Sequence, residues 1–202
     1  MLVREVMSQP AVTVNDTASI KTAITLFERH DVSAMPVIDE TGHLVGVISE
    51  ADVIRESVLP DQRVHENPVH MNAASQQLLV ADVMSCHPVT VTGDTDLAVA
   101  IDLMTTTAVK SLPVLDAGGL VGMVSRRDVI HVLARSDERI EADIDELFRQ
   151  TGHPWLVQAL DGIALIDGPQ KQSERELAQA LATTVPGVVG VSFAPVRSRR
   201  RP

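Results

Sequence analysis

Leu120-Val121-Gly122-Met123-Val124-Ser125-Arg126-Arg127-Asp128-Val129-Ile130 has a near copy earlier in the chain. That earlier stretch is Leu44-Val45-Gly46-Val47-Ile48-Ser49-Glu50-Ala51-Asp52-Val53-Ile54. In both, an apolar run with one glycine ends on a serine, and an aspartate three residues later lies in a helical pattern. Each stretch therefore predicts a strand that leads directly into a helix.

The duplication extends well beyond these two stretches. Val6-Met7-Ser8 recurs as Val83-Met84-Ser85, and Met35-Pro36-Val37-Ile38-Asp39 recurs as Leu112-Pro113-Val114-Leu115-Asp116. The offset is 77 residues from Met7 to Met84 and 76 from Gly46 to Gly122, so the second copy has lost one residue in a turn. Two copies favour a duplicated module over an open solenoid, which needs three or more repeats to bury its faces.

Composition limits the possible function classes. The chain has 202 residues, 45% of them hydrophobic, but only three Phe, one Trp and no Tyr, so its cores must be aliphatic. The single cysteine, Cys86, cannot form an internal disulfide, and we expect a cytoplasmic location. No apolar run approaches the ~20 residues that span a bilayer, so stable membrane insertion is not expected.

Charge argues against nucleic acid as a partner, because the formal net charge is −10. The basic exception is the end of the chain, which carries Arg197, Arg199, Arg200 and Arg201. A solvated terminus is favoured there over contact with an anionic partner.

Local patterns predict the elements of the first copy. We expect a short β segment at Ala11–Val14, then a helix capped by Asp16 or Thr17. Strands follow at residues 33–38 and 44–48, and residues 60–77 read as a linker between the copies. The linker histidines His65 and His70 have no thiol and no HExxH helix nearby, so no metal site is assigned.

The segment after residue 134 repeats neither copy. It predicts a charged helix at 136–150, a hairpin of strands 155–160 and 162–166, a helix at 173–184 and a strand at 188–193. We interpret it as a separate small α/β unit.

The paired motifs resemble the tandem CBS domain, or Bateman module. The resemblance covers about residues 1–134, in the order Val-Met-Ser, Pro-Val, and Leu-Val-Gly-x-Val/Ile-Ser-x-x-Asp, in both copies. It implies an α/β fold in which two sheet-and-helix motifs pack around a pseudo-two-fold axis, with clefts for an adenosine ligand and pairing into homodimers. The expected boundaries are 1–58 for the first motif, 59–77 for the linker, 78–134 for the second motif and 135–202 for the tail unit.

The tail unit resembles a BON domain. The likeness rests on Gly162–Gly168, Ser173-Glu174-Arg175 and Val185–Val191, although Ala164 and Asp167 stand where that family usually has Thr or Ser. BON units are associated with phospholipid surfaces or protein contacts. The acidic stretch from Asp137 to Glu146 argues against lipid, so a protein contact or self-association is expected.

The Ser-x-x-Asp turns have a structural and a functional interpretation. A serine cap with an acid at the third helical position is a capping box, although Asp is shorter than the usual Glu or Gln. The family implies that the aspartate binds the two ribose hydroxyls while the serine orients it. Both interpretations can hold, because a helix N-terminus is also an anion site.

The two clefts are not expected to be equal. Arg126 and Arg127 can bind phosphate where the first copy carries Glu50 and Ala51, so the second-copy site is predicted to be the stronger one. The alternative for these arginines is a solvated helix face. By family analogy the predicted stronger site comprises Ser125, Arg126, Arg127, Asp128, Thr90, Lys110, Ser111, Leu112 and Pro113. The weaker site comprises Thr13, Ser33, Ala34, Met35, Pro36, Ser49 and Asp52.

No catalytic constellation is recognisable: the sequence pairs no nucleophile with a base and has no glycine-rich phosphate loop. We therefore expect a non-catalytic module that binds AMP, ADP, ATP or a related adenosyl ligand, needs no obligatory cofactor, and signals to a partner or to the BON-like unit. One alternative is a structural dimerisation protein with empty clefts. Another is an anion-surface or nucleic-acid binder that works through the arginine tail.

Overall fold

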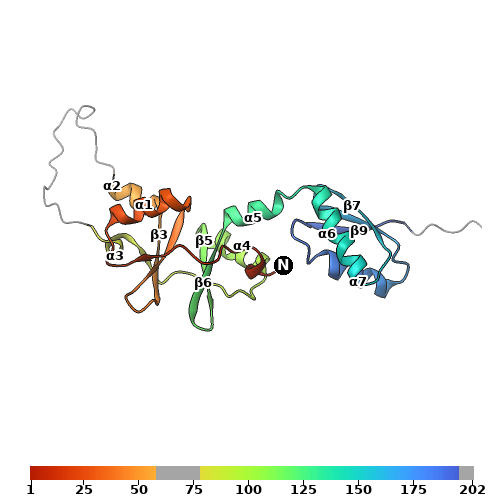
Figure 1. Ribbon diagram of the computed structural model, residues 1–202, viewed down its shortest axis with the longest axis horizontal. Helices are drawn as coiled ribbons and strands as arrows, with labels where there is room; N and C mark the ends of the chain where they lie inside the picture. Colours follow the sequence, from red (N-terminus) through yellow and green to blue (C-terminus); the bar gives the residue numbers. More distant parts are fainter. Residues whose placement is uncertain (58–77, 196–202) are drawn as a thin grey trace, which may run out of the picture. The chain divides into compact units, whose positions relative to one another are not determined.

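The computed structural model describes residues 1–57 and 78–195 and has a mixed α/β fold (Figure 1). The linker, including His65 and His70, and the arginine tail lie outside the described residues. The chain divides into two compact units, one of Met7–Ser125 and one of Met1–Val6 with Arg126–Pro202. The first contains both repeated strand pairs.

The first copy forms a sheet covered by two helices. Its elements are β1 (Val14–Asn15), α1 (Ile20–His30), β2 (Ala34–Ile38), β3 (Leu44–Ser49) and α2 (Glu50–Ser57). β1 pairs in parallel with β2, which pairs antiparallel with β3. Helices α1 and α2 contact each other (Figure 1). The core of this copy is mainly aliphatic, as predicted, with Met35, Val37 and Ile48 fully buried, but Phe27 belongs to it as well.

The second copy contains α3 (Val80–Val83), β4 (Ser85–Cys86), α4 (Leu97–Thr106), β5 (Ser111–Asp116) and β6 (Gly119–Ser125), of which β5 and β6 form a two-stranded sheet. β5 and β6 pair antiparallel from Ser111↔Ser125 to Asp116↔Gly119. The predicted strand pairs and the turns between them are confirmed in both copies.

The segment that leads into each copy pairs with a strand of the other copy. Strand β4 of the second copy pairs with Gly46 and Val47 of β3, while Ser8 of the first copy exchanges two backbone hydrogen bonds with Met123 of β6. The glycine repeated in β3 and β6 leaves room for this crossing of each lead-in segment to the other copy. A Cβ on Gly46 would lie 2.9 Å from the Ser85 carbonyl oxygen, and one on Gly122 would lie 2.8 Å from that of Ser8.

Two local predictions in the first copy were wrong. The β segment expected at Ala11–Val14 is β1 at Val14–Asn15, and α1 is capped by Ser19, whose hydroxyl accepts from the Thr22 N–H. The Thr17 hydroxyl instead donates to the side chain of Asn15 at 2.6 Å. The Asn15 side chain thus forms a turn that engages the Thr17 hydroxyl, and the helix begins only at Ile20, after Ser19.

The second unit begins with a short 3₁₀ helix, η1 (Val3–Glu5), and continues after β6 with α5 (Arg126–Leu133) and α6 (Asp137–Gln150). β7 (Leu156–Leu160), β8 (Ile163–Asp167), α7 (Gln172–Ala182) and β9 (Gly190–Phe193) follow. The sheet order is β7-β8-β9, with β7 antiparallel and β9 parallel to β8.

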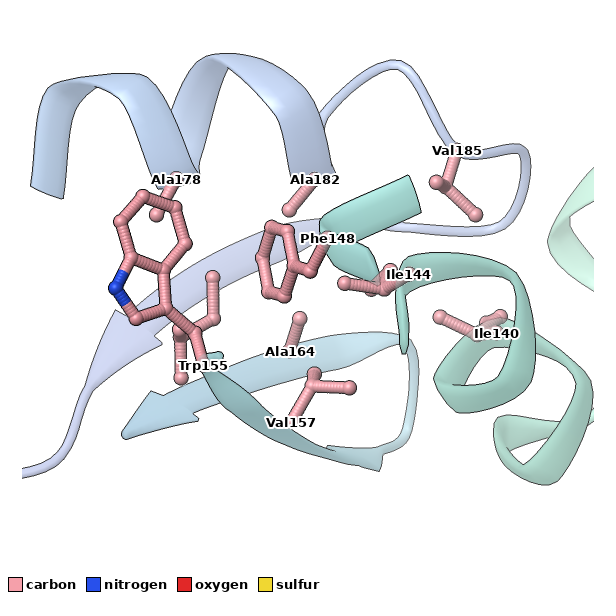
Figure 2. Packing of buried hydrophobic residues seen from close by; sticks show 10 residues of the cluster. Ile140, Ile144, Phe148, Trp155, Val157, Ala164, Ala178, Ala182 and Val185 are labelled. Carbon is pink, nitrogen blue, oxygen red and sulfur yellow. The ribbon is translucent and has the colours of Figure 1, made fainter. Parts of the chain in front are cut away.

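The core of this tail unit lies between the sheet and the helices α6 and α7. Figure 2 shows Val157 and Ala164 on the strands facing Ile144 and Phe148 of α6 and the alanines of α7. Trp155 packs edge-on against Phe148 and stacks on His153. The helices and the hairpin predicted for this segment are confirmed.

Candidate functional site

The first Ser-x-x-Asp turn holds its carboxylate in a fixed position. β3 ends at Ser49 and α2 begins at Glu50, so Asp52 lies in the first turn of the helix. Asp52 Oδ2 accepts a hydrogen bond from the Ser49 N–H at 2.9 Å and another from the Ser49 hydroxyl at 2.6 Å. This is the backward half of a capping box, and the serine orients the aspartate.

One oxygen of that carboxylate is available for a further bond. Both hydrogen bonds from Ser49 end on Oδ2, and within the described residues no hydrogen bond to Asp52 Oδ1 is formed. Asp52 is half-buried at the wall of a cleft. An oriented carboxylate in this setting can accept hydrogen bonds from a neutral polar group such as a sugar hydroxyl.

The cleft is built from both copies and has a volume of about 320 Å³, within the range typical of small-molecule sites. Aliphatic side chains form much of its wall, and Lys110 brings a cation from the second copy. The lining residues are Ser33, Ala34, Val47, Ser49, Glu50, Ala51, Asp52, Ser85, Pro88, Val89, Ala108, Val109, Lys110 and Ser111.

The structure regroups the residues that the sequence assigned to two sites. Lys110 and Ser111 were predicted to act with Asp128, but they line the cleft that holds Asp52. Ser33, Ala34 and Ser49 lie in the same cleft, as predicted for the site of Asp52. Ser111 is almost buried, at 9% exposure, whereas Lys110 is exposed.

Other predicted site residues lie elsewhere. Thr90 lines a separate depression between α4 and the β5–β6 hairpin, and Thr13 is half-buried outside the cleft lining. Four residues are buried within their strands and do not line the cleft: Met35, Pro36, Leu112 and Pro113.

At the second Ser-x-x-Asp turn, β6 ends at Ser125 and α5 begins at Arg126. Ser125 and Asp128 are half-buried, and Arg126 and Arg127 are exposed. All four take part in interactions with other groups. Because β6 passes directly into α5, the strand-to-helix junction predicted here is present.

Sequence reasoning missed the part of the cleft that comes from the lead-in of the second copy. Ser85, Pro88 and Val89 reach the cleft because β4 pairs with β3, and Ala108 and Val109 precede β5. The recurrence of Val-Met-Ser at a fixed offset identified this segment as repeated. It contained no signal that the segment crosses to the other copy.

The cleft offers the chemistry of a binding site. Two carboxylates, Asp52 and Glu50, line it together with a lysine, serine hydroxyls and an aliphatic wall. Among the residues that the structure describes, no group of three or more His, Cys, Asp or Glu is arranged to hold a metal ion. None of the described helices is long and apolar enough to cross a membrane.

Comparison with known proteins shows which family shares this architecture. The CBS domain family matches residues 3–59 and 80–135. The chain is 29% identical over 154 residues to the uncharacterized protein MJ1426 of Methanocaldococcus jannaschii, covering 66% of this chain and 91% of that protein. It is 33% identical over 132 residues to the 5'-AMP-activated protein kinase subunit gamma-3 of Sus scrofa, covering 64% of this chain and 24% of that subunit.

Solved structures agree with these sequence matches. CBSX2 in complex with AMP aligns with a TM-score of 0.52 and 28% identity over 64% of this chain and 93% of that one. The CBS domain pair of protein MJ0100, solved with 5-methylthioadenosine and S-adenosyl-L-methionine, aligns with a TM-score of 0.53 over 65% of this chain and 94% of that one. At 22% identity, this match shows only that the fold is shared. With two family matches that together cover more than half of its residues, the chain belongs to the CBS domain family.

Proposed function

We propose that this protein is a non-catalytic regulatory module that binds an adenosine nucleotide, namely AMP, ADP, ATP or a related adenosyl ligand. The observation that carries the proposal is the Asp52 carboxylate, which Ser49 orients at the wall of a cleft built from both copies. CBSX2, at 28% identity, was solved with AMP, and the gamma-3 relative is named as a subunit of an AMP-activated kinase. Both support this class of ligand.

Each part of an adenosine ligand has a matching group in the cleft. Asp52 Oδ1 accepts from the two ribose hydroxyls, and charge-assisted bonds of this kind are the strong ones. Val47, Pro88 and Val109 offer aliphatic surface to the purine faces. Lys110 attracts a phosphate, while Glu50 on the same lining repels one. These opposing charges favour an adenosyl group with little negative charge in this cleft.

The second junction is proposed as the stronger nucleotide site. Asp128 stands where Asp52 stands in the first copy, and Arg126 and Arg127 replace Glu50 and Ala51. Guanidinium groups form bidentate bonds with phosphate, so this site gains affinity as phosphates are added to the ligand. We therefore expect ATP and ADP to prefer Asp128.

The cleft couples ligand binding to the arrangement of the two copies. Its walls come from β3 and α2 of the first copy and from the segments that flank β4 and β5 of the second. A ligand held by both copies stabilises the arrangement that it fits, by no more than its difference in affinity between arrangements. Homodimerisation through the CBS motifs and a signal passed to a protein partner or to the BON-like tail complete the proposal.

Isothermal titration calorimetry on the full chain tests this function with AMP, ADP, ATP and S-adenosylmethionine in turn. Asp128→Asn should weaken ATP binding about ten- to hundredfold, the cost of ~1.5–3 kcal/mol for bonds to a charged group. Asp52→Asn should weaken only the lower-affinity event, and Glu28→Gln, an exposed acid on α1, should change neither.

Two results would overturn the proposal in different ways. No heat from any of the four ligands would favour a structural dimerisation protein with empty clefts. Equal losses in the two aspartate variants would remove the asymmetry between sites while leaving nucleotide binding in place. Thermal unfolding of each variant without ligand shows whether the loss of a helix-capping carboxylate has disturbed the fold.

A further inference from the structure

The sheet of the tail unit has a second apolar face that its own helices do not cover. Along β7 and β8, alternate residues are buried against α6 and α7, as Val157 and Ala164 show (Figure 2). The residues between them point to the opposite face. There the exposed fractions are 69% for Leu156, 74% for Leu160, 46% for Ile163 and 39% for Leu165.

The strand register makes these residues one surface, which we call the open face. Leu160 is paired with Ile163, and Leu165 lies between Gln158 of β7 and Ser192 of β9. Asp167, paired with Leu156, is the one charged side chain among these outward-pointing strand residues. Large contiguous apolar patches on soluble proteins usually mark an interaction site.

The pattern within β7 and β8 is that of strands covered on both sides. Leu156-Val157 and Ile163-Ala164-Leu165-Ile166 are continuous apolar runs, whereas a strand with one solvated face alternates apolar and polar residues. The inner residues of these runs already form the core with the helices. The outer residues therefore call for a second layer.

Acidic side chains of α6 occupy part of the free edge of β7 and the turn that follows it. Glu141 Oε1 accepts from the Ala159 N–H at 2.7 Å, and the Asp137 carboxylate accepts from the N–H groups of Asp161 and Gly162 in the turn. Charged side chains at an edge disfavour the addition of another strand. The face is therefore the favoured surface for a partner.

We propose that the open face is covered by the open face of a second copy of this chain. Helix α6 carries six acids on the other side of the sheet, Asp137, Glu138, Glu141, Asp143, Asp145 and Glu146, within a chain of net charge −10. Joining two open faces, on which Asp167 at the rim is the one charged strand residue, keeps these acidic helices on the outside of the pair. An anionic lipid surface or a nucleic acid would instead meet repulsion from them.

The shape of the face suits a two-fold pair. An axis parallel to β8 places β7 of each copy opposite β9 of the other, and such isologous contacts are the usual ones in dimers. The bulky Leu160 of one copy then lies over the small Gly190 of its partner, and Gln158 lies over Ser192. The result is a four-layer helix-sheet-sheet-helix arrangement with the sheets ~10 Å apart.

Pulsed electron–electron dipolar spectroscopy on the full chain tests this pairing. In a Cys86→Ser background, a spin label at Asp167→Cys on the rim of the open face reports only distances between chains. We expect a short distance, set by the ~10 Å sheet spacing and the two label arms. A label at Glu176→Cys, exposed on α7, should give a distance longer by the two intervening helix layers.

A matched pair of variants isolates the contact. Leu160→Gln with Leu165→Gln should abolish the short distance, whereas Leu177→Gln, which removes a leucine of 43% exposure from α7, should retain it. The proposal would be overturned if the short distance were absent or if it survived in the double variant. It would be absent, for example, if the Met7–Ser125 unit of the same chain covered the face. Nucleotide titration of the double variant should be unchanged, so failure here is distinct from failure of the proposed function.

Discussion

Asp39 illustrates how one side chain organises a turn between strands. Its Oδ1 accepts hydrogen bonds from the Thr41 hydroxyl at 2.6 Å, the Thr41 N–H at 2.8 Å and the His43 N–H at 2.9 Å. These bonds favour the ionised carboxylate, with the Thr41 hydroxyl as the largest cause, and they hold the pKa of Asp39 below its ordinary value of 3.8. The β2–β3 hairpin is therefore tightest when Asp39 is charged.

The pH dependence of this turn follows from the direction of that shift. A carboxyl whose folded pKa is depressed contributes stability above its unfolded pKa and loses it as the pH falls through the folded pKa. Thr41→Val should raise the pKa of Asp39 towards 3.8, as measured by NMR titration of the side-chain carboxyl carbon. Thr25→Val, on α1, is the control that should leave it in place. An unchanged pKa in Thr41→Val would show that the hydroxyl does not stabilise the carboxylate.

For single residues, the sequence predicted the chemistry of the candidate site better than it predicted which residues lie in the site together. The pairing of Ser49 with Asp52 follows from their spacing at a helix start, and the structure contains it. Spacing along one copy could not show that Lys110 and Ser111 share a cleft with Asp52, because that depends on how two copies pack. Non-local contacts of this kind leave no periodic signal.

Among the elements, strand β6 carries a test of the crossing between copies. A Cβ on Gly122 would lie 2.8 Å from the Ser8 carbonyl oxygen, so Gly122→Ala should force the lead-in segment away. Overpacking against backbone costs about 1–3 kcal/mol of unfolding free energy. Gly119→Ala in the same strand meets its nearest atom at 3.8 Å and should cost about 0.5 kcal/mol or less.

Urea unfolding followed by circular dichroism measures both glycine variants. Equal stability of Gly122→Ala and Gly119→Ala would mean that the lead-in does not pack against β6 as closely as the structure has it. Gly46→Ala should resemble Gly122→Ala, since its Cβ would meet Ser85 at 2.9 Å. This shared intolerance is the expected consequence of the duplicated crossing.

Element types were predictable where periodicity is strong, and boundaries were not where polar side chains compete for the backbone. The strands around Gly46 and Gly122 follow from continuous apolar runs, as does the hairpin at Asp161-Gly162 from its turn residues. The start of α1 was misplaced because Asp16, Thr17 and Ser19 are all acceptable caps by type. The side chain of Asn15 decided among them by binding Thr17.

For the whole molecule, the division into compact units separates the two repeated aspartates. Asp52 belongs to the unit of Met7–Ser125, whereas Asp128 lies on α5 in the unit that contains the tail. Trp155 is the single tryptophan, no tyrosine is present, and this ring is buried in the tail core. Its fluorescence therefore reports unfolding of the tail unit.

Ligand binding at Asp128 should consequently be visible at Trp155. A ligand that binds the native state alone raises its unfolding free energy by about 2.7 kcal/mol at about 100 times the dissociation constant. We expect ATP to raise the thermal midpoint of Trp155 fluorescence in the wild type and in Asp52→Asn, and to raise it much less in Asp128→Asn. If the ATP-induced rise of the midpoint were lost in Asp52→Asn instead, the stronger site would lie in the other unit. A midpoint that does not respond to ATP in wild-type protein that binds it would mean that the nucleotide signal does not reach the tail, and would direct the search for its output to a partner protein.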